Sequence, residues 1–288
     1  MSAGIGYALG AMVFFGLGDL LYKRGVAAGA LPHHLLMAQS WVFLPSVVLF
    51  GVVTGSLTFV PGTLWGTVAG LFMLLGFYNF AHSLTSGAVS INAPIFRLSF
   101  VITAALGVFL LGEPFDRYKV VGIALALAAV WLLLAAPAAG DAKRLESRAS
   151  LVRVAVATVA VGIGNVIYKY GLRAGATPAS LIVAQAAVVV PLATATAGAK
   201  DHSIRPPGVA LCYASAAAIV LAVAFALMVE GLARGDASVV VPIAQMGFGV
   251  TALIGFLVLR EPFTARKGAG LVAALAALAT FAYGEALM

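Results

Sequence analysis

The sequence predicts an all-α integral membrane protein whose ten transmembrane helices form two inverted five-helix repeats. Three observations lead to this fold class: a very apolar composition, ten long apolar segments, and an internal repeat that puts five segments in each half. Of the 288 residues, 62% are hydrophobic and only 9% are charged, against roughly 25% charged residues in a typical soluble domain. A soluble fold could not bury so much apolar surface.

The apolar segments have the length that a membrane crossing requires. A helix needs about 20 mostly apolar residues to cross a hydrocarbon core of about 30 Å. Helices are expected because a segment in lipid must satisfy its own backbone hydrogen bonds. The ten segments run approximately over Ala3–Tyr22, Leu35–Val53, Thr63–His82, Ala93–Leu111, Val120–Ala136, Leu151–Ile167, Ala179–Ala197, Gly208–Val229, Ser238–Leu259 and Gly268–Leu287.

A stretch near the start of each half is repeated at an offset of 146 positions. Asp19 corresponds to Asn165, so the second half replaces a carboxylate by an amide. The residues that keep their identity pair as Gly16 with Gly162, Gly18 with Gly164, Tyr22 with Tyr168, Lys23 with Lys169, Gln39 with Gln185 and Pro45 with Pro191. Such a long match indicates an internal duplication.

A second repeated stretch lies near the end of each half, at an offset of 148 positions. It pairs Arg97 with Gln245. The identical residues pair as Pro94 with Pro242, Thr103 with Thr251, Glu113 with Glu261 and Lys119 with Lys267. The change of offset indicates a small insertion between the two stretches.

The repeat divides the chain into residues 1–137, a polar linker over 138–150, and residues 151–288. Because each half has an odd number of segments, the second half enters the membrane from the opposite side. The halves are therefore inverted repeats. This architecture is common among secondary transporters, where the substrate site lies near the midplane between the repeats.

The order of these motifs resembles a known family. Two five-helix halves, a glycine-rich first helix ending in lysine, and a proline-bearing fourth helix followed by a Glu-Pro turn are similar to the EamA branch of the drug/metabolite transporter superfamily. The segment from Ala237 through Pro242 to Glu261 is especially similar. The resemblance covers essentially the whole chain and implies a ten-helix exporter or exchanger of small metabolites or amphipathic compounds.

The formal charge of +7 is spread singly between apolar runs. This pattern is typical of membrane-surface anchors and argues against a nucleic-acid partner. Connections after the odd-numbered segments hold 11 Lys and Arg residues, and those after the even-numbered segments hold 5. Because basic residues concentrate in cytoplasmic loops, this count places both termini outside. The family resemblance implies both termini inside.

Ionisable residues inside a membrane are costly and are candidates for function. Arg97 follows Pro94 by about one turn, and its guanidinium is suited to a carboxylate or phosphate. Asp19 could pair with Lys23 or Arg97 as a structural bridge, or it could exchange a proton during transport. Lys23 and Lys169 could bind substrate or extend to the membrane interface from helix ends.

The remaining candidates for substrate binding are polar residues in or beside the same segments. The duplicated tyrosines could line a pocket or belong to the interfacial aromatic belt. Together with Arg97, Asp19, Lys23 and Lys169, the candidate substrate-binding residues are Asn165, Tyr22, Tyr168, Asn79, His82 and Gln245. Gln39 and Gln185 are duplicated buried amides that could also bond helix to helix.

Several conspicuous residues are expected to be structural. Pro94 and Pro242 could open the helices around them or simply begin them. Glu113 and Glu261 each precede a proline and are expected to end a helix in a short surface turn. The lone Cys212 is expected to be a small buried side chain.

Secondary transport by alternating access is the function that the sequence favours, with no catalytic residue, cofactor or metal. The expected partners are the bilayer and a small substrate bearing a carboxylate or phosphate, with proton coupling an option and a monomer or homodimer the assembly. The cell membrane is the expected location. The alternative is a membrane-embedded enzyme or flippase acting on a lipid-linked substrate, although the ten acids are too scattered for a metal or acid–base site.

Overall fold

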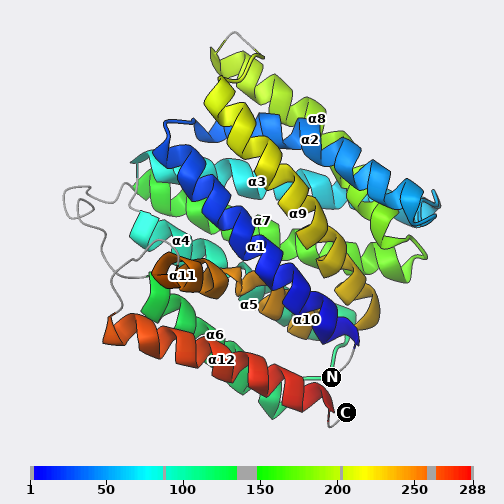
Figure 1. The fold of residues 1–288 in the computed structure, drawn as a ribbon. Helices are drawn as coiled ribbons and strands as arrows, with labels where there is room; N and C mark the ends of the chain where they lie inside the picture. The colour runs from blue at the N-terminus through cyan, green and yellow to red at the C-terminus, as the bar shows by residue number, and fades with distance from the viewer. Residues whose placement is uncertain (1–2, 87–88, 135–147, 202–203, 258–263, 287–288) are drawn as a thin grey trace.

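The computed structural model describes residues 3–86, 89–134, 148–201, 204–257 and 264–286. In these ranges the chain forms a helical bundle (Figure 1). Nine of the described helical segments are long and apolar enough to cross a membrane, and α6, the remaining span, has 18 residues. The unbroken spans are α1 (Ala3–Ala27), α2 (Pro32–Val53), α3 (Leu64–Ser86), α6 (Arg117–Leu134), α7 (Arg148–Arg173), α8 (Pro178–Asp201), α9 (Gly208–Arg234) and α12 (Ala265–Ala286), and a 3-10 turn, η1 (Pro61–Thr63), precedes α3.

The fourth and ninth spans are each broken into two helices. The fourth consists of α4 (Val89–Arg97) and α5 (Ser99–Leu111), and the ninth of α10 (Ala237–Gln245) and α11 (Gly247–Leu257). Each break comes four residues after the proline, which lies inside its helix and not at its start. A proline inside a helix removes one backbone hydrogen bond and crowds the preceding turn. The alternative that the prolines simply begin their helices is therefore wrong.

The two halves interlock so that equivalent helices make equivalent contacts. In the first half α1 packs against α9, and in the second half its counterpart α7 packs against α3. The counterparts α2 and α8 pack against each other, as do α6 and α12 at the edge of the bundle (Figure 1). The bundle is thus built from two inverted five-helix repeats with a shared interface.

Two glycines let the repeats approach closely. A Cβ on Gly16 would lie 2.6 Å from the carbonyl oxygen of Gly247, and one on Gly162 would lie 3.0 Å from that of Ser99. Thr251 Oγ1 donates to the Gly16 carbonyl at 2.9 Å. Its counterpart Thr103 donates to the Gly162 carbonyl at 3.1 Å. The contacts of α1 with α11 and of α7 with α5 are therefore the same contact, formed twice.

Spans alternate in direction, which defines two ends of the bundle. We call face A the end at which α1 begins and α5 ends, and face B the end at which α1 ends and α4 begins. Cys212 lies on α9 near face B and is exposed, not buried as its residue type suggests. On a helix facing lipid, a small apolar side chain needs no protein cover.

Candidate functional site

A polar network connects three helices at the two helix breaks. Arg97 is the last residue of α4, and Gln245 is the last residue of α10. The Arg97 guanidinium forms an ion pair with the Asp19 carboxylate of α1. It also donates to Gln245 Oε1 at 3.2 Å. Of the two bridging options that the sequence offers Asp19, the structure therefore shows the one with Arg97.

This network lies where the two repeats meet. Arg97 and Gln245 are counterparts, so their contact lies on the axis that relates one half to the other. The side chain of Arg97 is 15% exposed and that of Asp19 is 37% exposed. Both charged side chains are therefore partly exposed although they are paired with each other. The geometry is suited to a ligand that replaces one partner of the guanidinium.

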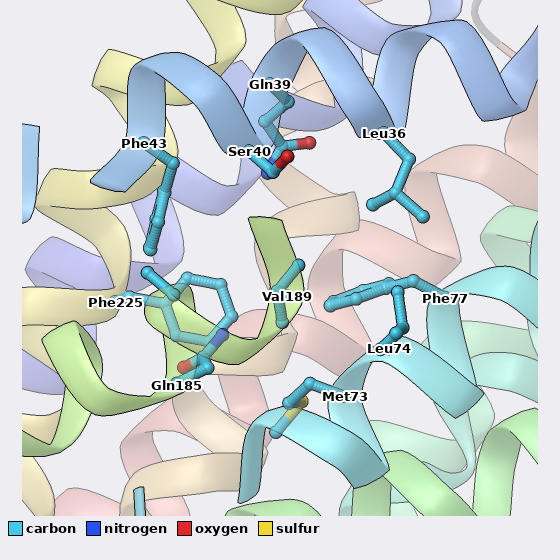
Figure 2. A pocket seen from close by; sticks show the side chains of 11 residues that line it. Leu36, Gln39, Ser40, Phe43, Met73, Leu74, Phe77, Gln185, Val189 and Phe225 are labelled. Carbon is cyan, nitrogen blue, oxygen red and sulfur yellow. The ribbon is translucent and has the colours of Figure 1, made fainter. Parts of the chain in front are cut away.

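A small cavity lies between α2, α3, α8 and α9. Its volume is about 30 Å³, enough for one or two water molecules. Gln39 of α2 and Gln185 of α8 both line it, so each half contributes one amide (Figure 2). The other lining residues are mainly apolar or aromatic and are Leu36, Ser40, Phe43, Met73, Leu74, Phe77, Ala186, Val189 and Phe225.

Tyr22 connects the polar network to this cavity. It lies one turn after Asp19 on α1, and its hydroxyl donates to the Gln39 amide oxygen. Phe225, on the cavity wall, packs edge-on against Phe15, one turn before Asp19. The ion pair and the cavity are therefore adjacent along α1.

The counterparts in the second half have different surroundings. Asn165 is fully buried, and its amide donates to Thr103 Oγ1 at 3.3 Å. Tyr168 is also fully buried, which excludes it from an interfacial belt. The Lys169 ammonium donates to the carbonyls of Leu232 at 2.5 Å and Gly235 at 2.7 Å, and so caps the end of α9.

The other candidates lie on α3 or near the end of α1. Asn79 donates to the Leu75 carbonyl of its own helix at 2.9 Å. His82 contacts Lys200 near face B and lies against the Tyr78 ring. Lys23 is exposed at the face-B end of α1. Among the candidates in the described part of the chain, Arg97 contacts Asp19 and Gln245 directly, and Tyr22 and Lys23 each lie one turn after Asp19 on α1.

A buried cluster of charges at face A was not anticipated from the sequence. Glu113 is 5% exposed, and its two oxygens accept the backbone N–H groups of Ala237 at 2.7 Å and Ser238 at 2.8 Å. The expected surface turn is therefore wrong, since Glu113 caps the start of α10 in the other half. Its counterpart Glu261 lies outside the described residues.

A second ion pair strengthens the same face. Lys119 is 2% exposed and donates to Asp236 at 2.7 Å and to the Pro114 carbonyl at 2.8 Å. We call Glu113, Lys119, Lys169 and Asp236 the face-A cluster. The repeated lysine was visible in the sequence, but the single carboxylate that it binds has no repeat to reveal it.

The two faces differ in how closely the broken helices pack. At face A, α5 packs along α10. At face B the equivalent pair is α4 and α11, and their described residues have at most marginal contact. In this structure the bundle is therefore closed at face A and less tightly packed at face B.

Together these features define a multi-pass membrane protein with a polar centre between two inverted repeats. The chain belongs to the EamA-like transporter family, whose model matches residues 2–135 and again residues 149–283. Twenty-nine solved chains match it. One of them, described as "Crystal structure of protein", is 18% identical over 96% of this chain and 95% of its own, with a TM-score of 0.81. That likeness shows the fold alone, and the comparison with curated proteins found no match.

Proposed function

We propose that this protein is a secondary transporter, an exporter or exchanger, that moves a small polar or amphipathic metabolite across the cell membrane by alternating access. The observation that carries the proposal is the ion pair of Arg97 and Asp19 at the meeting point of the repeats. Charged side chains within a membrane are costly and mark substrate or ion pathways. Inverted-repeat transporters bind substrate at this place in the fold.

The substrate proposed for this site bears a carboxylate or phosphate. Arg97 offers a planar set of donors that matches these groups, and its partner Gln245 is a neutral amide held at 3.2 Å. An anionic group on a ligand would bind Arg97 more strongly than Gln245 does. A zwitterionic ligand would also satisfy Asp19, so amino acids and related metabolites fit this charge pattern.

The first experiment is a thermal-stability screen of the detergent-purified protein against metabolites sorted by charge. A ligand that binds only the folded state stabilises it by RT ln(1 + [L]/Kd), so weak binders are visible at millimolar concentration. We expect anionic or zwitterionic compounds to raise the midpoint and Arg97→Ala to abolish the shift. Arg117→Ala, which removes an exposed arginine at face A, is the matched control.

The opposite result would redirect the search. If only cationic or aromatic compounds stabilise the protein, Arg97 is a structural partner and Asp19 becomes the substrate-binding candidate. If every anionic compound shifts the thermal midpoints of Arg97→Ala and Arg117→Ala by the same amount, the proposed site is wrong.

Proton coupling through Asp19 is a separate question about the same transporter. A carboxylate that exchanges a proton would have to leave its ion pair with Arg97 during the cycle. Substrate flux into proteoliposomes driven by a pH gradient tests this in Asp19→Asn. Unchanged flux in that variant would exclude the proton role.

We also propose that face B lies on the cytoplasmic side. Helix ends and connections at face B carry eleven basic and four acidic residues, whereas those at face A carry five of each. The entire formal charge of +7 thus belongs to face B, and basic residues mark cytoplasmic loops. This orientation differs from the one that the family resemblance implies.

Cysteine labelling tests the orientation directly. In a Cys212→Ser background, Phe59→Cys reports on face A and Ile204→Cys on face B, since both side chains are exposed. With a membrane-impermeant maleimide on intact cells, we expect labelling at position 59, and at position 204 only after permeabilisation. The reverse pattern would invert the orientation.

A further inference from the structure

A duplicated Tyr–Gln pair has a different state in each half of the molecule. In the first half the Tyr22 hydroxyl donates to the Gln39 amide oxygen. In the second half the equivalent atoms, Tyr168 Oη and Gln185 Oε1, are both buried, and neither has a hydrogen-bond partner among the described residues. Buried polar groups without partners are uncommon and require an explanation.

The two glutamines line one cavity, and the two tyrosines lie towards opposite faces. Gln39 and Gln185 point towards the same cavity from α2 and α8 (Figure 2). Tyr22 lies near the face-B end of α1, whereas Tyr168 lies near the face-A end of α7. Each pair therefore belongs to one face of the bundle.

The state of each pair follows the closure of its face. At face A, where α5 packs along α10, the Tyr168 side chain is fully buried and its pair is broken. At face B, where α4 and α11 have at most marginal contact among their described residues, Tyr22 is half-buried and its pair is formed. The Tyr–Gln hydrogen bond is thus formed at face B, which is the less tightly packed face.

We propose that the two Tyr–Gln pairs exchange states during transport, and this rests on the proposed alternating access. When face A opens, the Tyr168 hydroxyl turns to donate to Gln185 and no longer blocks face A. At the same time face B closes, and Tyr22 leaves Gln39 and becomes buried there. Inverted repeats make this exchange natural, because each half can adopt the conformation that the other has now. One hydrogen bond replaces an equivalent one, so this exchange by itself favours neither state strongly.

Two matched variants test the proposal. Tyr22→Phe removes a bond of the present state, and Tyr168→Phe removes the bond of the opposite state. A net hydrogen bond changes an equilibrium by about two- to tenfold. We therefore expect Tyr22→Phe to shift the population by that factor towards the state open at face A, Tyr168→Phe to shift it the other way, and the double variant to resemble the wild type.

Spin-label distances measure this population without any substrate. In a Cys212→Ser background, labels at positions 110 and 233 report the distance between the two halves at face A. Labels at positions 26 and 204 report it at face B. All four side chains are exposed. Opening of face A should lengthen the first distance and shorten the second. Shifts of both tyrosine variants in the same direction would overturn the proposal.

Thermal midpoints give an independent reading that needs only the present state. Tyr22→Phe should lower the midpoint because a formed bond is lost, whereas Tyr168→Phe should leave it unchanged or raise it, because the hydroxyl is unpartnered. An equal loss in both variants would contradict the inference. If the distances shift as expected but no metabolite stabilises the protein, the exchange stands and the proposed substrate class fails.

Discussion

The two faces of the bundle are built from the same repeated sequence, yet face A is closed more firmly than face B. At face A, Lys119 is buried with Asp236. At face B, Lys267 is the equivalent lysine, but the position equivalent to Asp236 is Ala88. The repeat therefore gives both faces the same helix arrangement. The Asp236 carboxylate, which has no counterpart, makes face A close more firmly than face B.

The centres of the two halves differ in the same way. Asp19 pairs with Arg97 and is 37% exposed, whereas Asn165 is fully buried among packed helices. The charged residue of the first half, Asp19, is thus partly exposed, whereas its neutral counterpart in the second half is buried. The proposed binding site thus rests on the asymmetry between the repeats more than on the repeats themselves.

The largest expected effect comes from breaking the contact that both halves share. Gly16→Leu or Gly162→Leu would force a side chain against a backbone carbonyl, at 2.6 and 3.0 Å already for the Cβ, and should cost about 3 kcal/mol, the upper end of the usual range for overpacking. We expect little folded protein by size-exclusion chromatography. Gly6→Leu is the control, since a Cβ there meets nothing within 4 Å, and comparable yields from all three variants would contradict this packing.

Asp236→Asn should come next, because it leaves the Lys119 ammonium buried without a carboxylate. Breaking a buried ion pair costs about 3 to 5 kcal/mol, and the low end applies since Asp236 is 33% exposed. We expect a lower thermal midpoint and a longer distance between spin labels at face A. Lys119→Met combined with Asp236→Asn should cost less than the sum of the single variants, and strict additivity would mean that the pair does not interact.

A smaller difference in stability loss should separate valine substitutions at the two equivalent threonines. Thr251→Val removes the hydroxyl that donates to the Gly16 carbonyl and, at 3.2 Å, to the Gly247 carbonyl of its own helix, and should cost about 1 kcal/mol. Thr103→Val removes the bond to Gly162 and also the partner of the Asn165 amide, so its loss should be larger. Thermal midpoints of the two variants measure this, and a greater loss in Thr251→Val would show that Asn165 gains nothing from Thr103.

The smallest effect should follow loss of the exposed ion pair at face A. Arg234 pairs with Glu230 one turn earlier on α9, and its side chain is 42% exposed. Exposed pairs contribute about 0.2 to 1 kcal/mol. Arg234→Gln should therefore lower the thermal midpoint far less than Asp236→Asn, and a similar loss in both would mean that burial does not distinguish the two ion pairs.

The sequence by itself determined the repeats, their inversion and the turns between helices. Gly29 and Gly175 adopt positive φ angles of 92° and 84° after α1 and α7, where glycine carries no steric cost. Each is followed three residues later by the proline that begins the next helix. Hydropathy, glycine and proline act within a few residues, so such features can be predicted locally.

Only the tertiary structure decided which polar groups meet. Asp19 and Arg97 are 78 residues apart, and nothing in their local sequence distinguishes that pairing from one with Lys23. Lys169, a substrate-binding candidate by its repeat, donates to carbonyls at the end of α9, and Glu113 caps a helix of the other half. These contacts depend on how helices from both halves pack, because a side chain in lipid must find its partner on a neighbouring helix rather than in water.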